Sequence, residues 1–345
     1  MVPDNFGPDD GTPPPGTPTG GPTDGDDSND PRPRSFWWHV SRVVDRFPGL
    51  LPFALVPLLT SLSQVENVRR ALDPAAGVSI NFEFALPTPF LDLWTFANPP
   101  DPPVRIDRRA VGGGSSPGGD PFADPTHPTG PAGTTGSGDT ELTVETPLQG
   151  VGIAIESGAA GVWIAIALFA YAAIAAIIVA VYVGGLDSRL RGERVALLAC
   201  VREYAPRLFL YTLLLVGAVL LLVPFALLTP AVLLVAIPAA VVLGYLFYAA
   251  PFLFVVADAS VVEAFRRSYG FAIDGGPYLS FALRHVTVAV IGSLVLSLFV
   301  SAGPVGFLFA LILAAPLSLV LTAASVSFVR DLVETKTEGC RRPTK

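Results

Sequence analysis

Six long apolar stretches determine what this chain can fold into. A bilayer core about 30 Å thick is crossed by about 20 apolar helical residues, and every stretch except the first reaches that length. The stretches cover residues 47–63, 157–184, 208–228, 231–257, 279–301 and 305–328. With 51% hydrophobic and 15% charged residues, the composition argues against an ordinary soluble domain. It predicts an all-α integral membrane protein.

The connections between these stretches predict six transmembrane helices arranged as three hairpins. Residues 229–230 and 302–304 join neighbouring stretches as tight turns without Lys or Arg. The loops 185–207 and 258–278 and the C-terminal tail 331–345 are instead rich in basic residues. Because cytoplasmic loops carry the excess of Lys and Arg, we expect a cell-membrane protein with both termini in the cytoplasm.

Three amphipathic segments precede the hairpins. Residues 35–46, 194–206 and 260–272 each place apolar side chains on one helical face. We expect short interfacial helices there, and simple extensions of the membrane helices are the alternative. Their arginines are expected to meet anionic lipid headgroups, so the lipid bilayer is the predicted partner. No sequence feature predicts nucleic-acid binding, and none indicates a protein partner. The apolar face of the first segment consists of Phe36, Val40, Val43 and Val44.

Residues 1–34 and 64–150 differ from the rest in composition. The first 30 residues hold seven Asp and no Lys or Arg among many Pro and Gly, so residues 1–34 are expected to be a disordered acidic tail. Residues 64–150 are predicted to be an extracytoplasmic insertion with short β-strands near 78–84 and 141–145 and a Gly/Pro-rich linker between them. The aromatic residues of this insertion that we expect at the membrane interface are Phe90, Trp94 and Phe96.

The basic and acidic residues also show a halophile-like bias across the whole chain. Asp outnumbers Glu by 19 to 10, and two of the 22 basic residues are Lys. This bias resembles that of proteins from organisms with high internal salt, and it bears on the source of the chain rather than on its function.

Residues 35–63 and 151–330 form the predicted transmembrane domain. The first part is predicted to contain one membrane helix and the second part five.

The ionisable and sulfur-containing residues form no recognisable active site. His39 and His127 lie far apart in the sequence and away from any carboxylate cluster, and Cys200 and Cys340 lack metal-ligand or disulfide spacing. No Ser-His-Asp arrangement is expected, and we predict no catalytic residue, no cofactor and no metal ion. Ionisable residues are expected outside the apolar cores, at helix ends that water reaches. They are Glu156, Asp258, Asp274, Arg284 and His285.

Hydroxyl side chains inside the last two apolar stretches form a predicted polar seam. Three lie on one face of residues 279–301 and three on one face of residues 305–328. The seam is interpreted as interhelical hydrogen bonding, which is typical of membrane helix contacts, and a narrow hydrophilic path is the alternative. Its expected pairs are Ser293 with Ser325, Ser297 with Thr322, and Ser301 with Ser318.

Residues 250–269 carry a short pattern in which a membrane helix with a proline is followed by an acidic residue and a capped amphipathic helix. The pattern consists of Pro251, Asp258, Ser260, Glu263, Ala264, Arg267 and Ser268, and Ser260 with Glu263 matches a capping box. It resembles a poorly characterised superfamily of polytopic proteins that includes the membrane domain attached to some glycerophosphodiester phosphodiesterases. The resemblance covers residues 36–63 and 150–330. It implies a six-helix α architecture without an assigned activity, and no phosphodiesterase domain accompanies it.

Two functional hypotheses follow from these features. The first is a noncatalytic envelope or membrane-organisation component. The alternative is a permease or lipid-handling transporter for a small or lipidic substrate, with the hydroxyl seam as its path. The lack of ionisable residues in the apolar cores favours the first hypothesis over an ion-coupled transporter.

Overall fold

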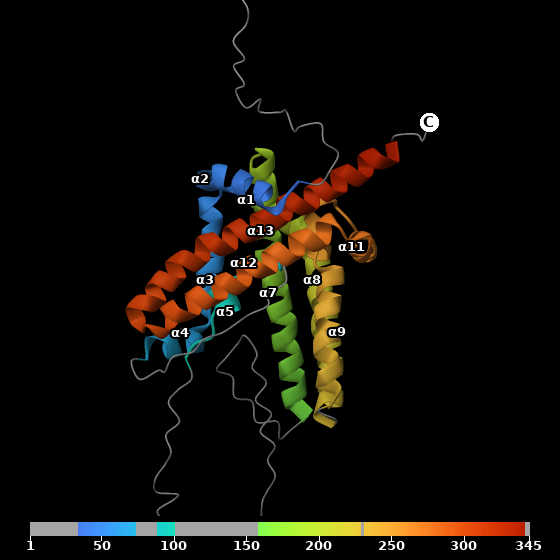
Figure 1. Cartoon of the computed structure of the whole chain (residues 1–345). Helices are drawn as coiled ribbons and strands as arrows, with labels where there is room; N and C mark the ends of the chain where they lie inside the picture. Colours follow the sequence, from blue (N-terminus) through green and yellow to red (C-terminus); the bar gives the residue numbers. More distant parts are fainter. Residues whose placement is uncertain (1–33, 74–87, 101–157, 229–230, 342–345) are drawn as a thin grey trace, which may run out of the picture. The chain divides into compact units, whose positions relative to one another are not determined.

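The computed structural model describes residues 34–73, 88–100, 158–228 and 231–341, and the regular secondary structure of these residues is helical (Figure 1). The predicted β-strands, the Gly/Pro-rich linker and nearly all of the acidic tail lie outside the described residues. The helices are α1 (Phe36–Asp45), α2 (Phe47–Leu50), η2 (Leu51–Ala54), α3 (Leu55–Ser63), α4 (Val65–Leu72), α5 (Leu93–Phe96), α7 (Gly158–Arg191), α8 (Leu197–Leu228), α9 (Ala231–Phe247), α10 (Ala250–Val256), α11 (Val261–Asp274), α12 (Pro277–Ser301) and α13 (Pro304–Arg341).

Five segments of these helices are long and apolar enough to cross a membrane, as the last five apolar stretches predict. They are Gly161–Arg191, Leu197–Leu221, Leu234–Val256, Pro277–Ser301 and Pro304–Thr337.

The first apolar stretch, residues 47–63, has a different form. It is divided into α2, η2 and α3, and it becomes a sixth span only when it is joined to α1, from which it bends by 75°. Pro48 and Pro52 stand at the starts of α2 and η2. Proline suits a first helical turn but lacks the N–H that would continue the helix before it. The described residues therefore contain five membrane-length spans, or six if the bent pair is one.

Three of these helices, α7, α8 and α13, are longer than hydropathy alone indicates. Helix α7 continues past Gly184 to Arg191, and α8 begins at Leu197, so the predicted loop 185–207 shrinks to residues 192–196. Gly192, at φ +80°, ends α7 in the left-handed conformation that favours glycine. No separate amphipathic helix forms at residues 194–206. Residues 197–206 are instead the first turns of α8, which is the alternative of a simple helix extension, and Pro206 does not break them. Helix α13 likewise runs on to Arg341.

The first amphipathic segment does form a separate helix, α1. Ser35 caps it by accepting a hydrogen bond from the Trp38 backbone N–H. Its buried residues are Phe36, His39 and Val43, at the spacing of one helical face, whereas Val44 is 52% exposed. The buried face is therefore rotated from the predicted one: it includes His39, which hydropathy leaves out, and it excludes Val44.

The third amphipathic segment forms the separate helix α11. The Ser260 hydroxyl accepts from the Glu263 N–H at 3.4 Å, which is the N-cap that the sequence predicts. The Glu263 carboxylate forms an ion pair with Arg267 one turn later, so it does not close the capping box. Gly275 and Gly276, at φ +63° and +50°, separate α11 from α12.

Replacing Gly306 with alanine is expected to destabilise the α12–α13 hairpin. A Cβ at this position would overlap the carbonyl oxygen of Phe299 and lie 2.8 Å from the Ala302 Cβ. Since a backbone oxygen cannot rotate away, the two helices must separate. We expect a loss of about 1–3 kcal/mol, the range for overpacked sites, measured as a lower melting temperature in detergent. Gly217→Ala in α8 is the control, because nothing lies within 4 Å of a Cβ there. An equal loss in both variants would contradict this account.

Candidate functional site

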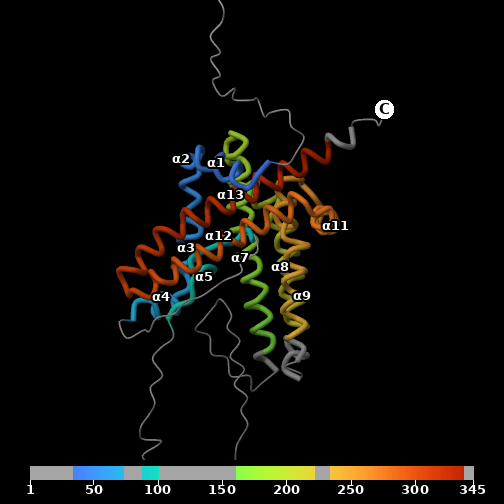
Figure 2. Tube along the Cα trace, in the orientation of Figure 1, coloured from blue at the N-terminus to red at the C-terminus, as the bar shows by residue number. Residues whose placement is uncertain are grey.

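Buried polar side chains gather on α13 and on the helices that pack against it. Helix α13 contacts α1, α7 and α12, and Figure 2 shows α12 and α13 side by side. Nearly all apolar neighbours in this region are tightly packed, so each buried polar group needs a partner or remains costly. The buried polar residues here are His39, Asp187, His285, Ser293, Ser297, Ser318, Thr322, Ser325 and Ser327.

The hydroxyls of the predicted seam are mostly buried, but their described contacts differ from the predicted pairing. Ser293 donates a hydrogen bond to the Phe96 carbonyl in the segment 88–100. Ser325 donates to the Leu321 carbonyl of its own helix at 3.0 Å. Ser297 is also buried, whereas Ser301 is half-buried.

The other two hydroxyls of the seam have weaker polar surroundings. The Ser318 Oγ has no hydrogen-bond partner among the described residues. The Thr322 hydroxyl lies beside the Tyr182 hydroxyl of α7 without the geometry of a full hydrogen bond. Thr322 therefore faces α7, and the seam does not form one continuous line between α12 and α13.

The stacked rings of Phe281 and Phe328 show why the expected pairs are wrong. Their centroids are 3.9 Å apart, so these two residues are level in the antiparallel α12–α13 pair. Ser293 lies about three helical turns from Phe281, toward the hairpin turn, whereas Ser325 lies about one turn from Phe328. The two serines are therefore about two to three turns out of register along the helices, and the other two expected pairs are out of register by a similar amount. In a tight hairpin, residues at equal distances from the turn are neighbours, and the expected pairs do not satisfy this condition.

His285 is the ionisable residue that the sequence prediction misplaces. Expected at a water-exposed helix end, it is fully buried about two turns inside α12. It lies one turn from Phe281, with the two rings 6.3 Å apart. Neither ring nitrogen has a hydrogen-bond partner among the described residues. A buried imidazole in a membrane-length helix is a candidate functional group by default.

His39, which the sequence places away from any carboxylate cluster, has a single carboxylate beside it. Its Nδ1 lies 3.0 Å from the Ser327 Oγ, and its Nε2 lies 3.8 Å from the Asp331 carboxylate. These are the residue types of a hydrolytic triad. His39 and Ser327 are both buried, however, and the distance from His39 to Asp331 exceeds hydrogen-bond length. The arrangement joins α1 to α13.

An ionic cluster joins α7 to α13 near the same end of the bundle. The buried Asp187 carboxylate forms ion pairs with Arg330 and with Arg191. Arg46, at the end of α1, donates to the carbonyl of Leu190. The sequence offers a local signal only for the Asp187–Arg191 pair, because these residues are one helical turn apart. Arg330 is 143 positions from Asp187, and no local pattern reveals that contact.

The residues of the family-like pattern hold α11 against its neighbours. Pro251 and Ala264 are buried. Asp258, at φ +50°, forms an ion pair with Arg207 of α8. The Ser268 hydroxyl donates to a carbonyl of α9 at 2.8 Å. Within the described residues these contacts are structural, and they supply no nucleophile or ligand set.

The segment 88–100 packs among the helices. Trp94 is 8% exposed, Phe96 is fully buried and Phe90 is half-buried, and their placement at a membrane interface stays a prediction. The Trp94 ring stacks on Phe307 of α13, and its Nε1 donates to the Ser61 carbonyl. No local pattern predicts this docking, since an aromatic residue after a loop is compatible with either placement.

Asp92 anchors the same segment. Its carboxylate accepts from the Thr95 N–H and hydroxyl, both at 3.0 Å, and from the Gln64 amide at 3.3 Å. Burial raises the pKa of the Asp92 carboxyl above its usual value, and these hydrogen bonds oppose the rise. A carboxyl with a raised pKa binds its proton more tightly in the folded state. Its contribution to stability is therefore greatest at low pH and declines as the pH rises from about 4 through the folded pKa.

Replacing Asp92 with asparagine is expected to flatten this pH dependence. Asparagine resembles the protonated acid and keeps an oxygen for the Thr95 N–H. The melting temperature of the wild type should fall more than that of the variant between pH 4 and pH 7. Asp92→Ala, which removes the cap, should cost about 0.5–2 kcal/mol at either pH. Parallel pH curves for wild type and Asp92→Asn would contradict the prediction.

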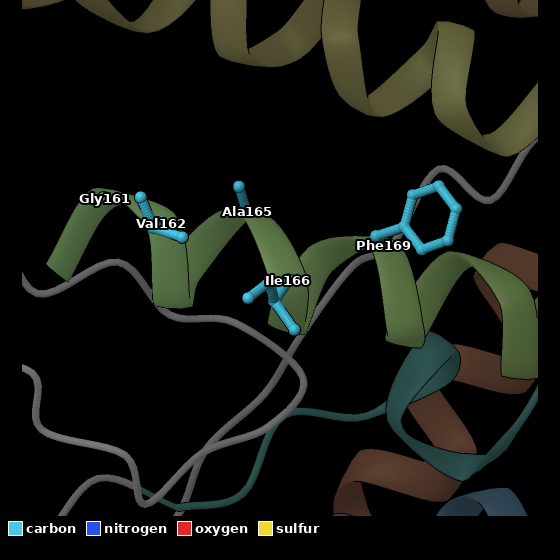
Figure 3. Close-up of a pocket in the computed structure, with 5 residues that line it drawn as sticks. All are labelled: Gly161, Val162, Ala165, Ile166 and Phe169. Carbon is cyan, nitrogen blue, oxygen red and sulfur yellow. The ribbon is translucent and has the colours of Figure 1, made fainter. Parts of the chain in front are cut away.

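A shallow surface hollow on the first turns of α7 is lined by apolar residues (Figure 3). They are Gly161, Val162, Ala165, Ile166 and Phe169, and none of their side chains offers a polar group to a substrate. Across the described residues, no group of three His, Cys, Asp or Glu side chains could hold a metal ion. No protein-family model, no curated protein and no solved structure matches the chain. The family resemblance therefore stays a prediction.

Proposed function

We propose that the chain is a multi-pass integral protein of the cell membrane that organises the membrane or envelope without catalysing a reaction. One observation carries the proposal: buried polar groups in the bundle join one helix to another. Ser293 bonds to the segment 88–100, Ser268 bonds to α9, and Arg330 pairs with Asp187 of α7. Such contacts rigidify a bundle.

Cysteine labelling tests the membrane placement and the N-in, C-in orientation. A variant with Cys200→Ala and Cys340→Ala provides a background without native thiols. A cysteine introduced at Gly118 should react with an impermeant reagent applied to intact cells, and one at Gly192 should react only after lysis. Cys340, restored alone, is the second internal probe. The reverse labelling pattern would overturn the orientation. Release of the protein by carbonate washing would overturn the integral placement.

The second candidate function is a permease or lipid-handling transporter, and His285 favours it. Neither nitrogen of this buried imidazole has a hydrogen-bond partner among the described residues, and the same holds for the buried Ser318 hydroxyl of α13. Alanine at both Ser297 and Thr322 distinguishes the candidates. Since intramembrane hydrogen bonds average about 0.6 kcal/mol, the structural role predicts little change in stability and none in lipid composition. A transport role predicts altered solute or lipid distribution with stability intact. Leucine at either position should lower stability under both.

A further inference from the structure

Four arginines meet where α1 crosses α13. Arg34, Arg46 and Arg330 all lie close enough to Arg42 to repel its guanidinium, and Asp331 is the acidic group that offsets them there. Arg330 is paired with Asp187, and Arg46 donates to a backbone carbonyl. Arg34 and Arg42 both lie near the Asp331 carboxyl, so one carboxylate faces two guanidinium groups. Neither arginine forms an ion pair in the described part of the chain.

Both of these arginines lie over one aromatic ring. The guanidinium carbons of Arg34 and Arg42 are 4.0 Å and 5.2 Å from the centre of the Trp38 ring. A guanidinium stacked on a ring uses its flat face for that contact. The N–H donors at its edge remain available, and they match the oxygens of a phosphate group in a bidentate arrangement.

Helix α1 also has the surface of an interfacial helix. It buries Phe36, His39 and Val43 in the bundle, while Trp37 is 62% exposed. Tryptophan is enriched at the headgroup level of membranes. The phosphate of a phospholipid lies at the same level. The two arginines could therefore contact the phosphate while Trp37 and the lipid both keep their preferred depth in the membrane.

Other basic residues near the helix ends lack one or both of these features. Arg207, Arg267 and Lys336 form ion pairs with acidic side chains. Arg202 and Arg266 are exposed, and neither guanidinium lies over an aromatic ring within the described residues. We propose that Arg34 and Arg42, held by Trp38, bind the phosphate of an anionic phospholipid. This inference rests on the proposed membrane placement and gives the lipid contact a defined position.

Thermal stability with added lipid tests the site. The full-length protein, purified in detergent, is melted with phosphatidylglycerol, with phosphatidylcholine, or with sodium phosphate. We expect phosphatidylglycerol to raise the melting temperature more than the other two. The Arg34→Ala/Arg42→Ala variant should lose about half or more of this rise, as weakened ligand binding requires. The Arg202→Ala/Arg266→Ala variant has the same charge change and should keep it.

Three results would overturn the proposal. The first is an equal loss of the lipid effect in both double variants. The second is a rise in melting temperature with sodium phosphate that equals the rise with phosphatidylglycerol, which would indicate a free-phosphate site. The third is measured on a lysine variant, if the alanine variant does not fold. Arg34→Lys/Arg42→Lys then replaces it, and a full lipid effect there would exclude bidentate recognition. Native mass spectrometry of retained phosphatidylglycerol gives an independent reading. Failure of the membrane placement itself is detected separately, by carbonate washing and cysteine labelling.

Discussion

Arg330→Ala is expected to destabilise the protein by about 3–5 kcal/mol, because it removes the buried partner of the Asp187 carboxylate and leaves that carboxylate with the more exposed Arg191. The side chains of Asp187 and Arg330 are 5% and 13% exposed. In so little water, the carboxylate cannot regain by hydration what it loses from the ion pair. We expect a lower melting temperature in detergent, followed by intrinsic fluorescence, because the contact between α7 and α13 is weakened.

Two further variants separate this charge effect from lost packing. Arg191 contacts the same carboxylate but is 40% exposed, so Arg191→Ala should cost no more than about 1 kcal/mol, as for surface pairs. The double variant Asp187→Asn/Arg330→Gln removes both charges together and should be more stable than Arg330→Ala alone. If Arg191→Ala and Arg330→Ala have equal effects, Asp187 is solvated and the buried-pair account is wrong.

The apolar spans could be predicted because hydropathy integrates over about 20 residues and does not depend on tertiary contacts. Five of the six predicted stretches lie in membrane-length helices. The ends of the spans were less predictable. Residues 185–191 and 329–341 are polar enough to resemble loops, but they lie in helices because side-chain ion pairs, such as that of Asp187 with Arg330, satisfy their charges.

The buried histidines could not be predicted, because their environment comes from distant parts of the chain. His39 contacts Ser327, which is 288 positions away. His285 lies in a sequence that alternates polar and apolar residues near the start of α12, where exposure and burial are equally compatible with the pattern. The i, i+4 relation to Phe281 is the local signal that could have placed it, but only with the knowledge that Phe281 faces α13.

The segment 88–100 shows a similar limit. Its docking depends on a backbone carbonyl of residue 61 and on the ring of Phe307, and both become neighbours only after the helices have packed. The hydroxyl of Ser293 was recognisable as a buried polar group from its spacing. Its hydrogen bond to the carbonyl of Phe96 was not, because a backbone acceptor leaves no mark in the sequence.

Alanine at Phe328 is expected to cost about 3–5 kcal/mol, the range for a phenylalanine removed from a packed core. The ring stacks on Phe281 at 3.9 Å, with 2° between the ring planes. Both rings are nearly inaccessible, so the cavity left behind would have few side chains able to fill it. Phe309→Ala on the same helix is the matched control. That ring is 55% exposed, and its loss should change the melting temperature little.

The same variant bears on function because of what surrounds the two rings. The His39 ring is 5.6 Å from Phe328, and the His285 ring is 6.3 Å from Phe281. The Phe281 ring is therefore near both buried imidazoles, since it is also 6.1 Å from the His39 ring. If the bundle is a structural element, Phe328→Ala should lower stability without making liposomes that contain the protein leaky to protons. If a hydrophilic path passes His285, the cavity would join it to the polar groups around His39, and proton leak should rise together with the loss of stability. A Phe328→Ala protein that is as stable as the Phe309→Ala control would contradict the packing on which both alternatives depend.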